Sequence, residues 1–188
     1  MHIPTLETER LILRAPRLED APAASAFYAT GRSQYVGGPE TDPVKLSKSF
    51  GNIAGLWLLR GFSLFVAEEK SNPGVPIGVV GPYEPIVWPE MEFGWSLYDA
   101  AAEGKGYITE AMRLLIPWTW KRTGKTTAVS FIDALNDRSR FVAKALGAVF
   151  DDRMSEAVNA PGGVFHDDAS AANPVTVWRH HRRTWEAA

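Results

Sequence analysis

Short segments in which apolar and polar residues alternate recur along the whole chain. Between positions 92 and 98 the residues run Glu-Phe-Gly-Trp-Ser-Leu-Tyr, so that every second side chain lies on the same face. Such alternation is typical of strands that bury one side in a sheet. We therefore expect strands over residues 10–14, 61–67, 76–80, 90–98, 127–132, 148–151 and 174–178.

Helices are expected between these strands. Asp42 and Pro43 form a helix start, because an aspartate accepts from free N–H groups and proline fits the first helical position. The predicted helices cover residues 18–29, 42–59, 105–121 and 138–146. Residues 153–174 are rich in Gly, Ala, Asn and Asp and are predicted to form a long loop. Strands alternating with helices predict one domain of mixed α/β (α+β) class.

The composition fits one soluble domain and excludes several chemistries. The chain has 188 residues, 45% of them hydrophobic and 22% charged, with a formal net charge of −2. This charge gives no reason to expect a nucleic acid or a membrane as partner. The absence of cysteine excludes disulfides, thiolate nucleophiles and cysteine metal sites. Since residues 1–7 lack a signal-peptide pattern and no apolar run reaches roughly 20 residues, we expect a cytoplasmic protein.

Two polar clusters are interpreted as solvated surface. His166 stands beside Asp167 and Asp168, but no helical spacing supports a metal site, and we predict no metal. Residues 179–183 read Arg-His-His-Arg-Arg. We expect a charged chain end there, rather than a segment that binds a phosphate or RNA.

A glycine-rich turn between a strand and a helix carries the strongest chemical signal. Residues 103–111 run Glu-Gly-Lys-Gly-Tyr-Ile-Thr-Glu-Ala. Such glycines let backbone N–H groups converge, and the helix dipole adds about half a positive charge, which suits a pyrophosphate. The turn is not a dinucleotide fingerprint, because Thr109 stands where a third glycine is needed. Residues 124–126, Gly-Lys-Thr, are not a P-loop, because Thr119 replaces its first glycine.

Four segments carry a family resemblance when they are taken together. They are the opening 6–14 with 18–21, the strand 92–97, the turn 104–111, and the Asn-Asp-Arg-Ser segment 136–139 with Lys-Ala-Leu-Gly-Ala at 144–148. In this order they resemble the GNAT acetyltransferases, in particular the RimJ/RimL-like branch of ribosomal-protein N-terminal acetyltransferases. The resemblance implies that residues 1–188 form a single N-acetyltransferase domain.

The GNAT resemblance implies a fold and a reaction. The fold is a central mixed, mostly antiparallel sheet with helices on both faces, splayed at the acetyl-CoA slot between the strands ending at Tyr98 and Ile132. The reaction is direct transfer of acetyl from acetyl-CoA to an amine, without a covalent enzyme intermediate. The acceptor is an amine of a protein N-terminus or of a small molecule.

The resemblance also assigns residues to the cofactor. Backbone N–H groups of the turn would bind the pyrophosphate, main-chain groups of the central strand the pantetheine and the oxyanion, and Asn136 the far side of the pantetheine. The residues implied in cofactor binding are Ser96, Leu97, Tyr98, Gly104, Lys105, Gly106, Tyr107, Ile108, Asn136 and Ser139.

Proton transfer in such a reaction needs a base for the ammonium group and a donor for the leaving thiolate. Glu92 and Glu90 lie two residues apart on one strand face, so either could be the base; either could also be a solvated edge charge. Ser139 is the candidate proton donor, or else a hydroxyl that satisfies a helix N-terminus. Asn136 is alternatively a plain N-cap, and Tyr107 a side chain that packs behind the turn.

The chain departs from the usual family pattern at four positions. Glu103 stands where Gln, Arg or Trp is usual, and a carboxylate beside a pyrophosphate is unfavourable unless it turns to solvent. Ile108 replaces Gly or Ala, Ala148 replaces an aromatic residue, and Ala143 replaces a tyrosine that protonates the thiolate. Two alternatives stay open: acetylation of an aminoglycoside-like or polyamine-like amine, and binding of acyl-CoA or a protein partner without turnover. The sequence does not indicate an oligomeric state.

Overall fold

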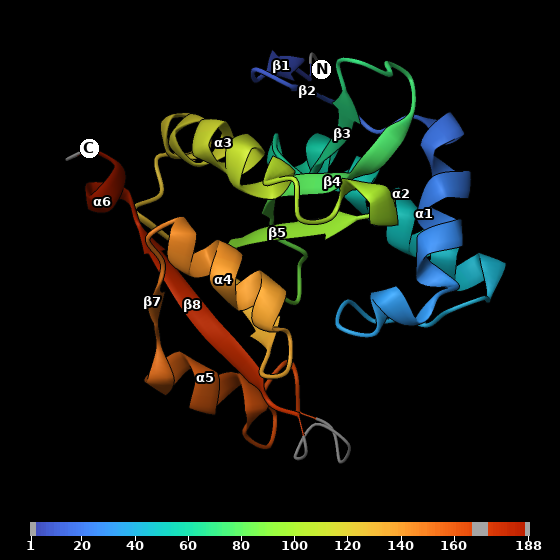
Figure 1. Cartoon of the computed structure of the whole chain (residues 1–188). Coiled ribbons are helices and arrows are strands. Elements are labelled where there is room, and N and C mark those ends of the chain that lie inside the picture. The colour runs from blue at the N-terminus through green and yellow to red at the C-terminus, as the bar shows by residue number, and fades with distance from the viewer. Residues whose placement is uncertain (1–2, 167–172, 187–188) are drawn as a thin grey trace.

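The computed structural model describes residues 3–166 and 173–186, and these contain one eight-stranded sheet with helices around it (Figure 1). The strands are β1 (Leu6–Glu7), β2 (Leu11–Arg14), β3 (Phe65–Glu69), β4 (Pro76–Tyr83), β5 (Glu92–Leu97), β6 (Thr127–Asp133), β7 (Val149–Phe150) and β8 (Val175–His181). The helices are α1 (Ala21–Tyr28), α2 (Pro43–Arg60), α3 (Tyr107–Thr123), α4 (Asp137–Ala145), α5 (Asp152–Asn159) and α6 (Arg182–Glu186). Short 3-10 helices occupy Leu18–Asp20, Gly31–Ser33 and Ala100–Ala102.

The sheet opens near its middle. The strand order is β1-β2-β3-β4-β5-β6-β8-β7, and all neighbours are antiparallel except β5 and β6, which are parallel. These two strands pair at one register point, Glu92 opposite Val129, and then diverge. The other edge of β5 stays paired with β4 from Tyr83 to Gly78. The splayed, mostly antiparallel sheet predicted for a GNAT fold is thereby confirmed.

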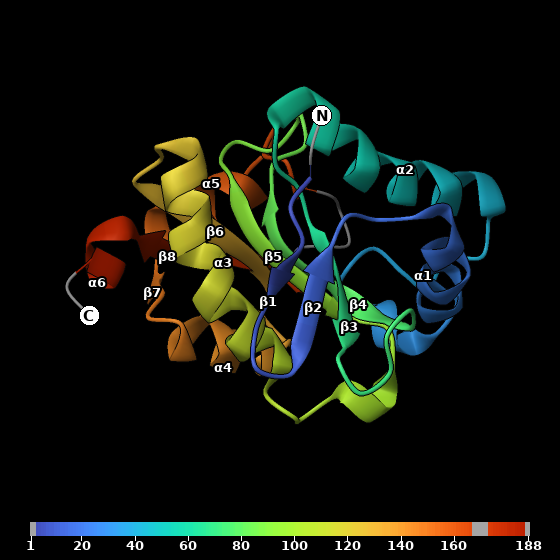
Figure 2. The same ribbon diagram turned by 90° about the horizontal axis from the view of Figure 1, so that it is seen from above.

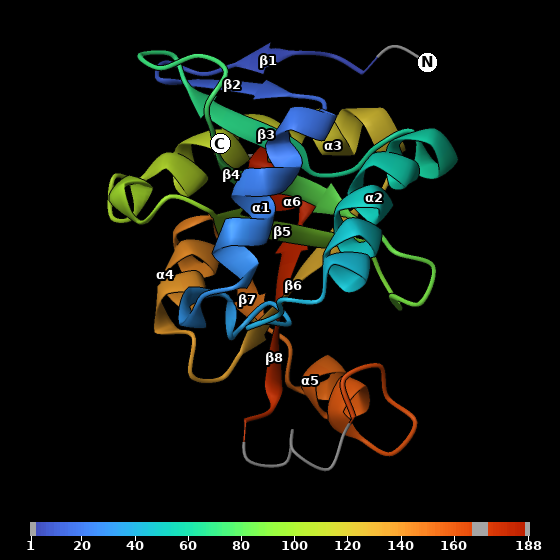
Figure 3. The same cartoon turned by 90° about the vertical axis from the view of Figure 1, so that its right-hand side faces the viewer.

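Helices cover both faces of this sheet (Figures 2 and 3). Because neighbouring strand residues point to opposite faces, Val80 packs with Leu115 of α3, whereas Val79 packs with Ile53 of α2. Helix α4 lies on the α3 side and α1 on the α2 side. At the far end of the sheet, α5 packs Val158 against Val177 of β8.

Most predicted elements are present, with shifts at their ends. Helix α2 begins as predicted, since the Asp42 carboxylate accepts from the backbone N–H of Val44 (2.8 Å) and Pro43 is the first helical residue. The strand predicted over 61–67 begins only at Phe65. Gly61 instead ends α2, with a φ of 75° that favours glycine.

The prediction of one long loop over residues 153–174 is wrong in its first part, where α5 lies. The side chain of Asp151 accepts from the N–H of Met154 (2.9 Å) and starts this helix. The exposed His166 follows, with Nδ1 2.9 Å from the carbonyl oxygen of Asn159. Asp167 and Asp168 lie outside the described residues.

The prediction of a charged chain end over residues 179–183 is also wrong, because β8 continues to His181 and α6 follows. His180 is fully buried beside Ser130, and burial lowers its pKa to about 3. Arg179 is matched by two carboxylates, donating to Asp151 (2.5 Å) and Glu90 (2.8 Å). These groups are therefore parts of the folded sheet.

The N-terminal segment fixes the start of α3. Glu110 in the first turn of that helix accepts from Thr8 Oγ1 (2.5 Å), from the Arg10 backbone N–H (2.9 Å) and from Arg10 Nε (2.6 Å). The Arg10 guanidinium also lies 4.6 Å from the centre of the Tyr107 ring. The opening motif and the glycine-rich turn thus form one structural unit.

Candidate active site

A cavity of about 1040 Å³ lies where β5 separates from β6, between the N-terminal ends of α3 and α4 and the segment that follows α1. Most residues implied in cofactor binding line it. These are Ser96, Leu97, Gly104, Gly106, Tyr107, Ile108, Asn136 and Ser139. Tyr98 and Lys105 do not.

The glycine-rich turn presents free backbone donors to the cavity. Gly104 and Gly106 have φ angles of 74° and 78°, which other residues adopt with strain. Gly106 is the N-cap of α3 without a side-chain cap, and the first helical bond runs from Glu110 N–H to the Gly106 carbonyl (3.0 Å). The N–H groups of Tyr107, Ile108 and Thr109 therefore have no partner within the helix. They form a site for an anion at the positive end of the helix dipole.

The side chains of this turn point away from the anion site. Lys105 Nζ lies 3.5 Å from Glu69 Oε1, on the side facing β3. Tyr107 packs in the core beside Arg10, as the packing alternative expected. Ile108 lines the cavity but is only 8% exposed, because most of its side chain packs in the core beside α3 and the sheet.

The gap beside β5 exposes main-chain groups of alternate residues. Toward β6, the Met91 carbonyl accepts from Val129 N–H (3.0 Å) and the Phe93 carbonyl accepts from Ser130 Oγ (2.7 Å). Because main-chain groups alternate in direction along a strand, Trp95 and Leu97 also face this side, where β6 has already diverged. The main chain of Trp95 and the N–H of Leu97 are thus placed to bind a ligand chain lying in the gap, whereas the Leu97 carbonyl accepts from Arg32 (3.0 Å).

The expectation that Tyr98 lends main-chain groups to a cofactor is not supported by its contacts. Its N–H donates to the Ile77 carbonyl of β4 (2.8 Å), and its carbonyl accepts from Arg32 Nη1 (2.7 Å). Its ring packs against Phe27, 5.5 Å between centres. By the same alternation, the main-chain N–H and carbonyl of Ser96 point toward β4, although the residue borders the cavity.

The start of α4 forms the wall across the gap. Asn136 is the N-cap, with Oδ1 accepting from the backbone N–H of Ser139 (3.1 Å). The Ser139 hydroxyl therefore does not cap the helix; it accepts from Trp95 Nε1 (3.2 Å). This leaves the hydroxyl hydrogen of Ser139 free to be donated to a ligand. Ala143 is fully buried, and Ala148 packs with it.

Glu92 lies at the closed end of the gap, on the α2 and α5 face of the sheet. Its partly exposed carboxylate accepts from Trp88 Nε1 (2.7 Å). Trp88 in turn makes edge contacts with Tyr83, Phe131 and Phe165, at 6.2, 6.1 and 5.3 Å between ring centres. Burial among these rings raises the pKa of Glu92 to about 7, against the hydrogen bonds from Trp88 and the Phe131 backbone.

Glu90, the other candidate base, has different surroundings. Both of its carboxylate oxygens accept from Arg179 Nη1, at 2.8 and 2.9 Å, and Thr127 Oγ1 donates to one of them (2.8 Å). Both oxygens of this carboxylate are therefore occupied by donors from the protein. The two glutamates thus have different surroundings, aromatic rings around Glu92 and an arginine and a threonine at Glu90.

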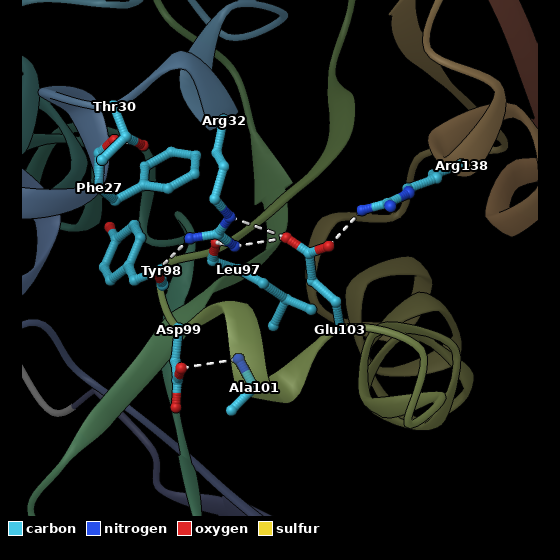
Figure 4. A network of polar contacts seen from close by, with 9 residues as sticks. All are labelled: Phe27, Thr30, Arg32, Leu97, Tyr98, Asp99, Ala101, Glu103 and Arg138. Carbon is cyan, nitrogen blue, oxygen red and sulfur yellow. Dashed lines mark hydrogen bonds and ion pairs between the residues drawn. The ribbon is translucent and has the colours of Figure 1, made fainter.

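Glu103, at the mouth of the anion site, joins two arginines (Figure 4). Arg32 donates to its Oε1 through Nε (2.9 Å) and Nη2 (2.5 Å), and Arg138 pairs with its Oε2. Arg32 also donates to the carbonyls of Leu97 (3.0 Å) and Tyr98. The carboxylate is thus neutralised by protein groups instead of turning to solvent.

The sequence matches the family described as Acetyltransferase (GNAT) domain over residues 10–149. The chain belongs to the GNAT acetyltransferase family. An acetyltransferase from Agrobacterium tumefaciens str. C58 is 31% identical, with a TM-score of 0.80 and 96% of each chain covered. This GNAT protein is an acetyl-CoA-dependent N-acetyltransferase, as the resemblance predicted.

More distant structures share the GNAT fold. RimL, a ribosomal L7/L12 α-N-protein acetyltransferase in complex with coenzyme A, is 19% identical with a TM-score of 0.69, covering 96% of this chain and 98% of that one. The ribosomal-protein-S5-alanine acetyltransferase from Vibrio fischeri is 18% identical with a TM-score of 0.67, covering 97% and 98%. No curated protein matches the sequence.

Acetyl-CoA fits this GNAT site, because free N–H groups, two arginines and an unpaired strand edge line one cavity. Within residues 3–166 and 173–186, no group of three His, Cys, Asp or Glu side chains is arranged to hold a metal ion. None of the helices in these ranges combines the length and the apolar content needed to cross a bilayer.

Sequence reasoning missed four side chains that shape the site: Trp88, Trp95, Arg32 and Arg138. The tryptophans stood in or beside the predicted central strand, so their position was a usable signal. Arg32 lies 71 residues from Glu103 in the chain, and no local pattern links the two.

Proposed function

We propose that this GNAT enzyme acetylates a primary amine by direct attack on the acetyl thioester, with Glu92 as the general base. The observation that carries this proposal is the setting of Glu92, a partly exposed carboxylate among aromatic rings at the closed end of the gap. With a pKa of about 7, this group is about half ionised at neutral pH and holds a proton well once it takes one. The oxygens of Glu90 are instead occupied by donors from Arg179 and Thr127.

The cofactor residues divide into two sets in this proposal. The N–H groups of Tyr107, Ile108 and Thr109 hold the diphosphate, and the main chain of Trp95 and Leu97 holds the pantetheine along the gap. A main-chain N–H of β5 directed into the gap stabilises the developing oxyanion. Bound acetyl-CoA supplies the activated acetyl group.

The leaving thiolate is served by Ser139 in this proposal. Its hydroxyl accepts from Trp95 Nε1, which orients the oxygen and leaves the hydrogen for donation. Ala143 has no proton to donate. Because it is fully buried in a cluster with Ile132, there is no space beside it for another proton donor. Ser139 is therefore the proton donor that the wall of the gap offers.

The acceptor is proposed to carry a single positive charge, as a protein N-terminus does. Two other carboxylates that precede Glu92 in the chain are already paired, Glu84 with Lys125 (3.1 Å) and Glu90 with Arg179. A polyamine or an aminoglycoside would bring several charges to a place where the described residues offer Glu92 as the carboxylate without a cationic partner, among several aromatic rings. Two proteins with the same fold carry names of ribosomal-protein acetyltransferases, which agrees with an N-terminal acceptor.

Release of free coenzyme A thiol tests the function and the acceptor together. The panel contains peptides with free and with blocked N-termini, spermidine and an aminoglycoside. We expect release with the free N-termini and its loss with the blocked ones. Release with spermidine or the aminoglycoside alone would contradict the proposed acceptor. No release with any amine, while coenzyme A still binds, would contradict catalysis and favour a binding protein.

A further inference from the structure

An internal carboxylate stands where a phosphate-binding site would be expected to hold only positive groups. Glu103 directly precedes Gly104, and both residues line the cavity with Arg32 and Arg138. The two guanidinium groups approach opposite oxygens of Glu103, one from the segment after α1 and one from the first turn of α4 (Figure 4). The free N–H groups at the start of α3 border the same cavity.

The two arginines are held very differently. Arg32 has a side-chain exposure of 30% and donates to three protein groups, Glu103 and the carbonyls of Leu97 and Tyr98. Arg138 has a side-chain exposure of 85% and pairs with Glu103 alone among the described residues. An exposed pair of this kind contributes little stability, so Arg138 can exchange its partner readily. Arg32 is the fixed member of the trio and Arg138 the exchangeable one.

We propose that the Glu103 carboxylate takes the place of a phosphate group of coenzyme A. It pairs with Arg138, and Arg138 is the side chain that binds the phosphate when the cofactor is present. This inference rests on the cofactor of the proposed function. In the ligand-free enzyme Glu103 satisfies both guanidinium groups. On binding, a phosphate takes Arg138, while Arg32 keeps Glu103 neutralised and turned aside. Glu103 therefore lowers the affinity for the cofactor without preventing binding.

Calorimetric titration with coenzyme A tests this inference on binding alone. Glu103→Gln keeps the shape of the side chain and removes its charge, so coenzyme A should bind about 3–10-fold more tightly. Arg138→Gln should weaken binding by a similar factor. Arg140→Gln is the matched control, because Arg140 lies on the same helix and pairs with Asp137. It should leave the affinity unchanged.

Truncated ligands identify the phosphate. A gain shared by coenzyme A and dephospho-coenzyme A assigns Arg138 to the diphosphate, and a gain limited to coenzyme A assigns it to the 3′-phosphate. Unchanged or weaker binding by a folded Glu103→Gln would overturn the inference, as would an equal gain for pantetheine, which has no phosphate. If Glu103→Gln does not fold, Arg138→Gln decides: coenzyme A bound as tightly as by the wild type overturns the inference. A wild-type protein that binds no coenzyme A would instead overturn the proposed function.

Discussion

Replacing Glu92 by glutamine should make the protein more stable and less active at the same time. Glutamine keeps an oxygen that accepts from Trp88 Nε1 but carries no charge into the aromatic surroundings. If Glu92 is the base, turnover should fall by roughly 10²–10⁴-fold. The stability change has the opposite sign, because burial penalises the ionised carboxylate that catalysis requires.

The size of the stability gain follows from the pKa. Its displacement from the ordinary 4.5 to about 7 corresponds to roughly 3 kcal/mol, since one pKa unit is worth about 1.4 kcal/mol. Because the carboxylate is partly exposed, solvent screens part of this penalty, and roughly 1–3 kcal/mol is expected. Between pH 4.5 and about 7 the folded protein retains a proton that the unfolded chain releases. The stability contributed by Glu92 therefore falls as pH rises through this window, and the full penalty applies above it.

Thermal unfolding of wild type and Glu92→Gln at pH 5 and pH 8.5 measures this difference. At pH 8.5 the variant should unfold roughly 3–10 °C higher, and at pH 5 the two proteins should nearly coincide. Glu90→Gln is the matched control: it leaves Arg179 with one carboxylate, so it should destabilise the protein at both pH values. A Glu92→Gln variant that is less stable than wild type at pH 8.5, or equally shifted at both pH values, would refute the reasoning.

Three further predictions concern the cofactor site and the buried histidine. Gly106→Asp should abolish the rise in melting temperature caused by acetyl-CoA. Gly106→Asn, which introduces the same backbone strain without the charge, should retain part of this rise. An unchanged rise in Gly106→Asp would place the cofactor elsewhere. Ser139→Ala should slow turnover about 10–100-fold with acetyl-CoA affinity nearly unchanged and little loss of stability, since Asn136 caps the helix; full activity would remove Ser139 from the mechanism. Burial lowers the pKa of His180 to about 3, so the unfolded chain binds a proton there that the folded protein does not, and wild type should lose stability as pH falls from 6.5. His180→Leu should lose less stability between pH 7 and 5. Equal losses of the two proteins in urea unfolding would contradict this.

Local signals predicted the parts of the fold and of the site that depend on neighbouring residues. The helix start at Asp42 and the glycine-rich turn are each set by side chains within a few positions, so a short stretch of sequence predicts them. Helix α5 was missed because few of its residues are apolar: Val158 meets the sheet, and Ser155 bonds to the backbone of β8.

The long-range parts of the site could not be predicted in the same way. The partnership of Arg32 with Glu103 depends on how the segment after α1 folds back over β5, and neither residue signals the other. The different surroundings of Glu90 and Glu92 depend on β8, which brings Arg179 to the first and leaves the second among aromatic rings. Strand spacing predicted both carboxylates on one strand face, but β5 begins at Glu92 and Glu90 precedes it, and the spacing could not supply their neighbours.

The position of β8 has a consequence for how the chain is made. This strand is synthesised after the other seven strands of the described residues, yet it lies between β6 and β7, with seven register pairs to β6. A nascent chain that has not yet released residues 175–181 presents two unpaired strand edges in the middle of its future sheet. Until Arg179 is in place, Glu90 and Asp151 also lack the arginine with which both of them pair. Premature release from the ribosome would therefore yield an aggregation-prone protein, not one that merely lacks a tail.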